Sequence, residues 1–250
     1  MRKIGFIGYD SIDIVLYTAR LLKAATDSKV VVVDKTLMQS VIGTVDLPSD
    51  CEGTGFYHEN IIISDSYVTS EADDSTIVLY YFEYNFNCSE LAECEDVFLV
   101  TDLISTNARN LNMVDIKDKP ENPGVDIESD ESDSNSKKSK KKGFGKSKKY
   151  ADDFVEGEVR VHLIIRNVID LKYGEKYIST LINKNIREDR VHYLPMSELE
   201  YKNRCYVCMD YTKSLAHLTD DMKTVLISIL SQLTEKEYLR KDALLLIKKA

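Results

Sequence analysis

The stretch Lys3–Thr36 reads KIGFIGYDSIDIVLYTARLLKAATDSKVVVVDKT and decides the fold of this 250-residue chain. Its first apolar run, Ile4–Gly8, predicts a buried strand. Ser11–Ala25 places apolar side chains at intervals of three and four residues and predicts a helix, with Ser11 as its N-cap. Lys29–Asp34 then predicts a second buried strand. Strand, helix and strand in this order form a βαβ unit, in which a phosphate is commonly held between the first strand and the helix.

The turn between that strand and helix lacks most of the residues that bind a phosphate. Its residues are Gly8, Tyr9, Asp10, Ser11, Ile12 and Asp13, with one glycine, no lysine and no Ser/Thr in the magnesium position of a Walker A loop. Asp10 and Asp13 put carboxylates at the positive end of the helix dipole, where they repel a second anion. We expect no cation to counter them. The turn therefore predicts no cofactor, no metal and no catalytic residue.

The rest of the chain continues the alternation of strands and helices. Helical spacing recurs in Leu103–Met113, Tyr173–Asn183, Met222–Leu233 and Glu235–Lys249, and Ser89–Glu93 predicts a short turn. In Tyr173–Asn183 we expect Tyr177, Ile178, Leu181 and Ile182 on one face. The pattern predicts an α/β, doubly wound, mostly parallel sheet of about seven strands with helices on both faces. Further short apolar runs predict strands at Ile61–Ile63, Ile77–Phe82, Val97–Val100, Val159–Ile165 and Val191–Leu194.

Composition narrows the class of protein. The formal net charge of −9 argues against a protein that binds nucleic acid over its whole surface. Five cysteines at irregular spacing are typical of a reducing compartment. Neither a secretory signal nor an apolar run long enough to cross a membrane is evident. We expect a cytoplasmic protein, with a peripheral position at the inner face of the membrane left open.

The segment 115–150 interrupts the pattern. Its first part is acidic, and its second part carries a block of lysines: Lys137, Lys138, Lys140, Lys141, Lys142, Lys146, Lys148 and Lys149. Almost no aliphatic residue interrupts either part, so burial cannot offset the entropy of ordering, and we expect a disordered insertion. Residues 1–114 and 151–250 are then expected to form a single domain.

The order and texture of these segments resemble the MinD/ParA family of deviant-Walker ATPases. KVVVVDKT is similar to the family's second strand, which also ends in an aspartate, and Thr76–Tyr84 resembles its Walker B strand. Asp96–Asp102, Leu163–Asn167 and Val191–Pro195 match later strands in order. The sequence departs from the family where its chemistry lies. Only Gly8 corresponds to the motif GKGGxGK[ST], and Tyr81 or Glu83 stands in place of the Walker B aspartate.

The resemblance implies the fold and a degenerate member, a pseudo-ATPase. Family relatives with eroded loops are found among the localisation factors of Tad-type pilus systems. The resemblance thus implies a non-catalytic adaptor or scaffold in a bacterial secretion, pilus or positioning apparatus, with protein partners and a homodimer possible. The alternative is a nucleotide-binding switch with an unorthodox phosphate loop.

Two smaller constellations remain open. Asp34 and Glu83 close neighbouring predicted strands and, with Asp10 and Asp13, could form an acidic cluster that holds a divalent cation. More often such residues are solvated strand ends or helix caps. Cys205 and Cys208 form a lone CxxC, which suggests half a zinc site or a redox pair, or two half-buried thiols without such a role. For His162 and His192, which fall in predicted strands, we expect ordinary packing.

Two basic segments suggest surface contacts. The lysine block could bind anionic lipid or a nucleic-acid backbone, which makes a tether the second alternative function. The neighbouring acidic block could instead neutralise it. The predicted C-terminal helix is basic and amphipathic, and we expect it to pack on the core or in a partner's groove rather than on a membrane.

Overall fold

The computed structural model describes residues 1–42, 55–58, 61–65, 75–114, 116, 159–169, 174–182, 186–208 and 214–250. Its strands are β1 (Arg2–Gly8), β2 (Val30–Asp34), β3 (Gly55–His58), β4 (Ile61–Ser64), β5 (Ile77–Glu83), β6 (Asp96–Thr101), β7 (Arg160–Val168) and β8 (Val191–Pro195). Its α-helices are α1 (Ile12–Ala25), α2 (Ser105–Asn110), α3 (Gly174–Leu181), α4 (Glu198–Cys208), α5 (Asp220–Thr234) and α6 (Arg240–Lys249). Short 3₁₀ turns include η2 (Ser89–Glu93) and η3 (Leu111–Met113).

The strands form one twisted sheet in the order β3-β4-β2-β5-β1-β6-β7-β8. Seven of them are parallel, and β3 pairs with β4 in the antiparallel direction at one edge. The strands before and after segment 115–150 lie side by side, with Val97 of β6 opposite Val161 of β7. Neighbouring parallel strands are joined by crossover segments that pass over a face of the sheet, usually as helices. The valine and isoleucine runs of the strands are therefore covered on both faces.

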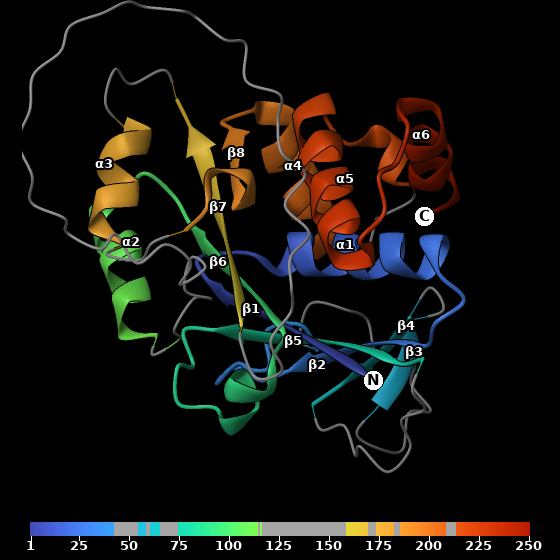
Figure 1. Cartoon of the computed structure of the whole chain (residues 1–250), viewed down its shortest axis with the longest axis horizontal. Coiled ribbons are helices and arrows are strands. Elements are labelled where there is room, and N and C mark those ends of the chain that lie inside the picture. Colours follow the sequence, from blue (N-terminus) through green and yellow to red (C-terminus); the bar gives the residue numbers. More distant parts are fainter. Residues whose placement is uncertain are drawn as a thin grey trace, which may run out of the picture.

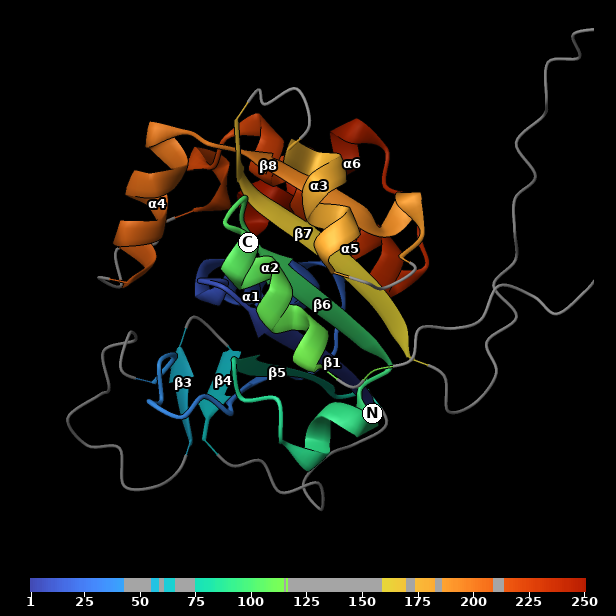
Figure 2. The same ribbon diagram turned by 90° about the vertical axis from the view of Figure 1, so that its left-hand side faces the viewer.

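Helices cover both faces of the sheet. Figure 1 shows α1, α5 and α6 gathered on one side and α2 and α3 on the other, and Figure 2 gives the view turned by 90°. Alternate residues of each strand divide between the two layers: Phe6 packs with the helices of the α1 side, and Ile7 with those of the α2 side. The doubly wound α/β architecture expected from the sequence is confirmed.

Most predicted elements occur within a residue or two of their expected bounds. Two details are wrong. Tyr177 is 51 % exposed while Ile178 and Ile182 are buried, so it does not share their face. The last helix begins at Arg240 rather than at residue 235, because Glu235 takes a left-handed backbone (φ 54°) as the C-cap of α5.

Among the strands and α-helices of the described residues, one strand and one helix were not predicted. β3 is a short edge strand, and α4 has weak amphipathic character because it carries mostly polar side chains. Insertion residues 115 and 117–150 lie outside the described residues. Within the described parts of the chain, no helix is long and apolar enough to cross a bilayer.

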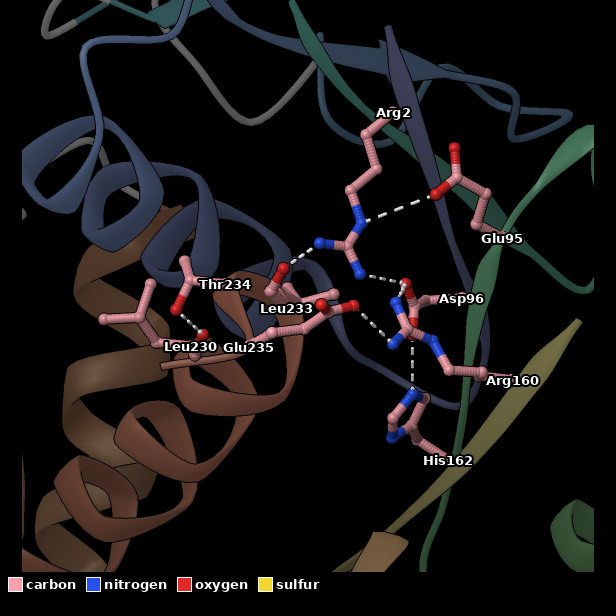
Figure 3. A network of polar contacts seen from close by, with 9 residues as sticks. All are labelled: Arg2, Glu95, Asp96, Arg160, His162, Leu230, Leu233, Thr234 and Glu235. Carbon is pink, nitrogen blue, oxygen red and sulfur yellow. Dashed lines mark hydrogen bonds and ion pairs between the residues drawn. The ribbon is translucent and has the colours of Figure 1, made fainter. Parts of the chain in front are cut away.

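A buried carboxylate organises the amino edge of the sheet (Figure 3). Asp96, at the start of β6, is completely buried and accepts hydrogen bonds from Arg2 (2.8 Å) and Arg160 (2.9 Å) on one oxygen. Its other oxygen lies 3.0 Å from Nε2 of His162. Arg2 also donates to the carbonyl of Leu233, and Arg160 to Glu235. Asp96 thereby joins the first residues of β1, β6 and β7 to the C-terminal end of α5.

The charge states follow from this geometry. Burial opposes ionisation of Asp96, but the hydrogen bond from His162 and the charges of Arg2 and Arg160 outweigh it and hold the pKa well below its usual value. Burial lowers the pKa of His162, and the charges of Arg190 and Arg160 add to this effect. Neutral His162 then donates its Nε2 proton to Asp96, and its ring stacks on Phe98 with the ring centroids 4.3 Å apart. The sequence predicted only packing for this histidine, and the hydrogen bond to Asp96 is an additional role.

The second buried histidine predicts loss of stability in acid. Burial lowers the pKa of His192 from 6.5 to about 4. Between these two pH values the unfolded chain binds more protons at this site, so the free energy of unfolding falls as the pH falls, by up to about 3 kcal/mol. Denaturant unfolding from pH 7 to pH 4 should show a shallower loss for His192→Gln than for the parent. His217→Gln, at an exposed position, serves as the control; equal slopes in all three proteins would contradict this origin.

Candidate functional site

The turn between β1 and α1 begins in close contact with the neighbouring strand, β6. Gly8 has φ +115°, and a Cβ at this position would lie 2.0 Å from the carbonyl oxygen of Val100 in β6. The next amide, of Tyr9, donates to the same oxygen at 2.9 Å. Glycine is therefore required here both for its backbone conformation and for this close approach. The Tyr9 amide is consequently not available to a phosphate.

The turn is also short. Only Tyr9, Asp10 and Ser11 separate the end of β1 from the first residue of α1. A Walker A loop places four residues between its two glycines, and its backbone amides surround the phosphates. Three residues, of which Tyr9 already donates its amide to β6, are too few to form a comparable arch. The degenerate phosphate-loop residues Gly8, Tyr9, Asp10, Ser11 and Asp13 thus form a closed turn.

An arginine from a distant strand pairs with the carboxylate at the start of α1. Arg166 of β7 binds both oxygens of Asp13, at 2.6 and 2.7 Å, and also donates to the backbone carbonyl of Asp10. Asp13 and Arg166 are both buried. Such a forked pair is among the stronger contacts a carboxylate can make. It brings together two residues that lie 153 positions apart.

A second arginine lies at the same turn. Arg204 of α4 pairs with the carboxylate of Asp10 at 2.6 Å. The expectation that no cation counters Asp10 and Asp13 is therefore wrong: two guanidinium groups, from β7 and α4, do so. A signal existed in the sequence, because Arg166 interrupts the apolar run of β7, and a buried arginine needs an acidic partner. The sequence could not show which acid it meets.

The protonation states around the turn follow from burial and these charges. Burial disfavours the charge on Arg166, but Asp13 and then Asp10 outweigh it and raise its pKa. Burial, with the nearby carboxylates of Asp102 and Glu83, raises the pKa of Tyr84 to about 12. The Arg166 guanidinium therefore stays charged and the Tyr84 phenol stays neutral across the physiological pH range.

Asp34 is a local cap and not a cation ligand. It is buried, and one oxygen accepts from the amide (3.0 Å) and the hydroxyl (2.7 Å) of Thr36. Its other oxygen accepts from the amides of Val41 (2.7 Å) and Ile42 (3.1 Å). Both oxygens thus bind donors of the turn after β2, so Asp34 is neither a solvated strand end nor the cap of a helix.

The remaining acidic residues do not gather into a metal site. Glu83 accepts from the Ser40 hydroxyl at 3.3 Å, and Asp10 and Asp13 are paired with arginine. In the parts of the chain that the structure describes, no three His, Cys, Asp or Glu side chains are arranged to hold a metal ion. The suggested divalent-cation cluster is therefore not formed by these residues.

Backbone irregularities gather at this carboxyl edge. Asp10 (φ 43°), Glu83 (φ 52°) and Asn167 (φ 55°) take left-handed conformations at the ends of β1, β5 and β7. The β1–β5 register shifts between Phe6 and Ile7, and the β7–β8 register shifts near the end of β7. Such features commonly mark a binding edge, because they re-aim side chains.

The other sequence candidates stand apart from this turn. Cys205 and Cys208 lie on α4. The Cys205 thiol is half-buried and joins no group of metal ligands among the described residues, and the side chain of Cys208 lies outside them. The eight lysines of residues 137–149 lie outside the described residues. Their predicted contact with an anionic surface stays a prediction.

The buried pair predicts a large and non-additive effect on stability. Asp13→Leu or Arg166→Leu alone should lower the free energy of unfolding by about 3–5 kcal/mol, because each leaves an uncompensated buried charge. The double variant should cost clearly less than the sum of the two. Urea unfolding of the four proteins measures this coupling.

The exposed pair Arg187–Asp189, at 2.7 Å, is the matched control for this cycle. Arg187→Leu should cost less than about 1 kcal/mol, since solvent screens an exposed pair. Additive single effects at Asp13 and Arg166, no larger than that control, would contradict the role of the buried pair.

Comparison with known proteins identifies the fold of this chain. No protein-family profile and no curated protein matches the sequence. Among solved structures, the chain is similar to a ParA family ATPase from Chlorobium tepidum, with a TM-score of 0.51 and 11 % sequence identity over 97 % of this chain and 96 % of that one. The match extends over nearly the full length of both chains. This protein therefore has the fold of a ParA family ATPase.

Proposed function

We propose that this protein is a non-catalytic adaptor or scaffold built on a ParA-like fold. The observation that carries the proposal is the buried Arg166–Asp13 pair at the start of α1. In a nucleotide-binding relative of this architecture, the helix N-terminus and a cationic side chain would receive phosphate. Here a protein carboxylate sits at the helix N-terminus and the arginine binds that carboxylate.

Electrostatics supports the absence of nucleotide chemistry. A phosphate approaching the start of α1 would meet the carboxylates of Asp10 and Asp13, and their arginines are already engaged. To recruit Arg166, it would have to break a buried pair and leave Asp13 uncompensated, which is costly at a buried position. The short turn offers no further arch of amides in return.

The surface around the turn supports an adaptor role. Ligands of doubly wound folds bind at the carboxyl ends of the strands. In this protein large apolar side chains are exposed after four of those ends: Leu37 and Met38 after β2, Ile104 after β6, Ile169 after β7, and Met196 and Leu199 after β8. Met38 is 84 % exposed and Met196 68 % exposed. Exposed apolar side chains at a binding edge favour contact with another protein.

The resemblance noted in the sequence extends this proposal to a process. Relatives with eroded phosphate loops suggest a component of a bacterial secretion, pilus or positioning apparatus. We propose that the carboxyl edge contacts another component of such an apparatus. Tethering through the lysine block remains a separate prediction, tested by deleting residues 137–149 and measuring retention on anionic liposomes and DNA.

Calorimetric titration with ATP and with ADP, each with Mg²⁺, tests the non-catalytic assignment. We expect no saturable heat for the full chain up to millimolar nucleotide, because the start of α1 is occupied by the protein's own ion pair. An assay for released phosphate should show no turnover above buffer. Micromolar affinity, or phosphate release that saturates with ATP, would overturn the proposal.

The adaptor role predicts that the carboxyl edge is needed for partner retention. Met196→Asp combined with Leu199→Asp should reduce the proteins retained by the tagged chain in its native cell by tenfold or more, by mass spectrometry, since burying one carboxylate costs several kcal/mol. Leu245→Asp on α6, also at an exposed leucine (57 %), is the control. Unchanged retention in the double variant, with its fold intact by circular dichroism, would rule out this edge as the interface.

A further inference from the structure

Helix α4 buries none of its described side chains. It follows β8 at the carboxyl edge, and Figure 2 shows it at the outer margin of the molecule. The side chains that the structure describes, at positions 198–205, are all exposed or half-buried, and Leu199 and Tyr201 are among the exposed ones. Helices in proteins are stabilised mostly by packing an apolar face on the core. Over this part of its length, α4 lacks that source of stability.

Two polar side chains on one face of α4 attach it to the fold. Glu200 and Arg204 are four residues apart, so they lie on the same side of the helix. Arg204 pairs with the Asp10 carboxylate, in the turn after β1, at 2.6 Å. Oε1 of Glu200 accepts from the amide of Thr219 at 2.9 Å and also from its hydroxyl. The attachment that the structure describes is therefore polar.

This attachment is weak for three reasons. Oε2 of Glu200 is shielded from solvent and accepts no hydrogen bond from the described residues, so the closed position leaves a buried acceptor unsatisfied. The Asp10 carboxylate is partly exposed, so water screens its attraction to Arg204. A further hydrogen bond, from Asn203 to the carbonyl of His217, is long at 3.4 Å. The closed position of α4 is thus only slightly favoured.

The elements beneath α4 have contacts of their own that do not involve it. Thr219 is the N-cap of α5, and its hydroxyl oxygen accepts from the amide of Met222 at 3.2 Å. The apolar side chains of α5 are buried in the core. Asp13, at the start of α1, stays paired with Arg166 of β7. Movement of α4 would leave these contacts in place.

We propose that α4 is a latch, a helix that detaches as a unit while the sheet and α5 stay folded. Segments with few buried apolar contacts open locally at a lower free energy than the whole protein. An isolated helix of 11 residues is marginal in water, so α4 loses its helical hydrogen bonds once it detaches. Detachment frees Glu200 and Arg204 for other partners and uncovers the carboxylate of Asp10. The latch is a property of the protein alone and does not depend on the adaptor function.

Amide hydrogen exchange of the full ¹⁵N-labelled chain, followed by NMR, tests the latch. After correction for intrinsic rates, amides 202–205 should exchange about 100-fold or more faster than amides 225–229 of α5. Addition of about 1 M urea should leave the exchange of 202–205 within about twofold of its value in buffer, because local opening exposes little surface. Exchange of 225–229 should rise about tenfold or more, because it requires global unfolding.

Ile229→Val in α5 separates the two kinds of opening. Ile229 is buried in the core, and the lost methylene should raise the exchange of 225–229 about fivefold. Exchange of 202–205 should stay within about twofold of the parent, because α5 remains folded when α4 detaches.

Arg204→Gln tests the ion pair that holds the latch. It should raise the exchange of 202–205 about fivefold, and Asp10→Asn, which removes the same pair from the other side, should match it. Lys202→Gln is the matched control, because the pair between Lys202 and Glu198, at 2.7 Å, lies within α4 and does not attach it to the fold. This control should stay within about twofold of the parent.

Three results would refute the latch. One is exchange of 202–205 at the rate of α5 with the same rise in urea, which would mean that α4 opens only when the whole protein unfolds. Another is equal acceleration of both helices by Ile229→Val. The third is exchange of 202–205 in Arg204→Gln and Asp10→Asn that is no faster than in Lys202→Gln.

Discussion

The forked ion pair between Arg166 and Asp13 is the constraint on which the carboxyl edge of this protein depends. It fixes the first turn of α1 to β7, and the same guanidinium binds the carbonyl of Asp10. The turn after β1 therefore contacts β7 through Arg166 and β6 through the amide of Tyr9. Leaving a buried charge without its partner costs several kcal/mol. The positive end of the α1 dipole therefore meets a carboxylate of the chain itself.

A second buried carboxylate, Asp96, connects several elements at the amino edge of the sheet. Asp96 holds Arg2 and Arg160, and these two arginines in turn contact the end of α5. The pairs Arg166–Asp13 and Arg160–Asp96 each join a residue that precedes segment 115–150 to one that follows it. The parallel pairing of β6 with β7 makes the same connection through the backbone. Ion pairs and backbone pairing together thus hold the two parts of the chain in one sheet, and large apolar side chains at the carboxyl edge stay exposed.

The parts of the fold that could be predicted are those with a repeating pattern. Short β-branched runs indicated seven of the eight strands, and apolar spacing indicated α1 and α5, because burial on both faces imposes those patterns. β3 and α4 were missed, since a short edge strand and a mostly polar helix bury too little to leave a signal. Tyr177 was placed on the wrong face, because an aromatic side chain at the border of an apolar stripe can turn to solvent. The acidic turn was predicted, but its arginine partners were not.

The amino acid sequence of this protein was sufficient to establish the βαβ opening, the parallel sheet and the loss of the phosphate-binding residues, because strand and helix periodicity and a missing motif are local properties of a chain. Only the folded molecule decided that Arg166 and Arg204 neutralise Asp13 and Asp10, and that Asp34 caps its own loop. These pairings join residues far apart along the chain, and their partners are selected by the register and crossing of the strands, which no local pattern encodes.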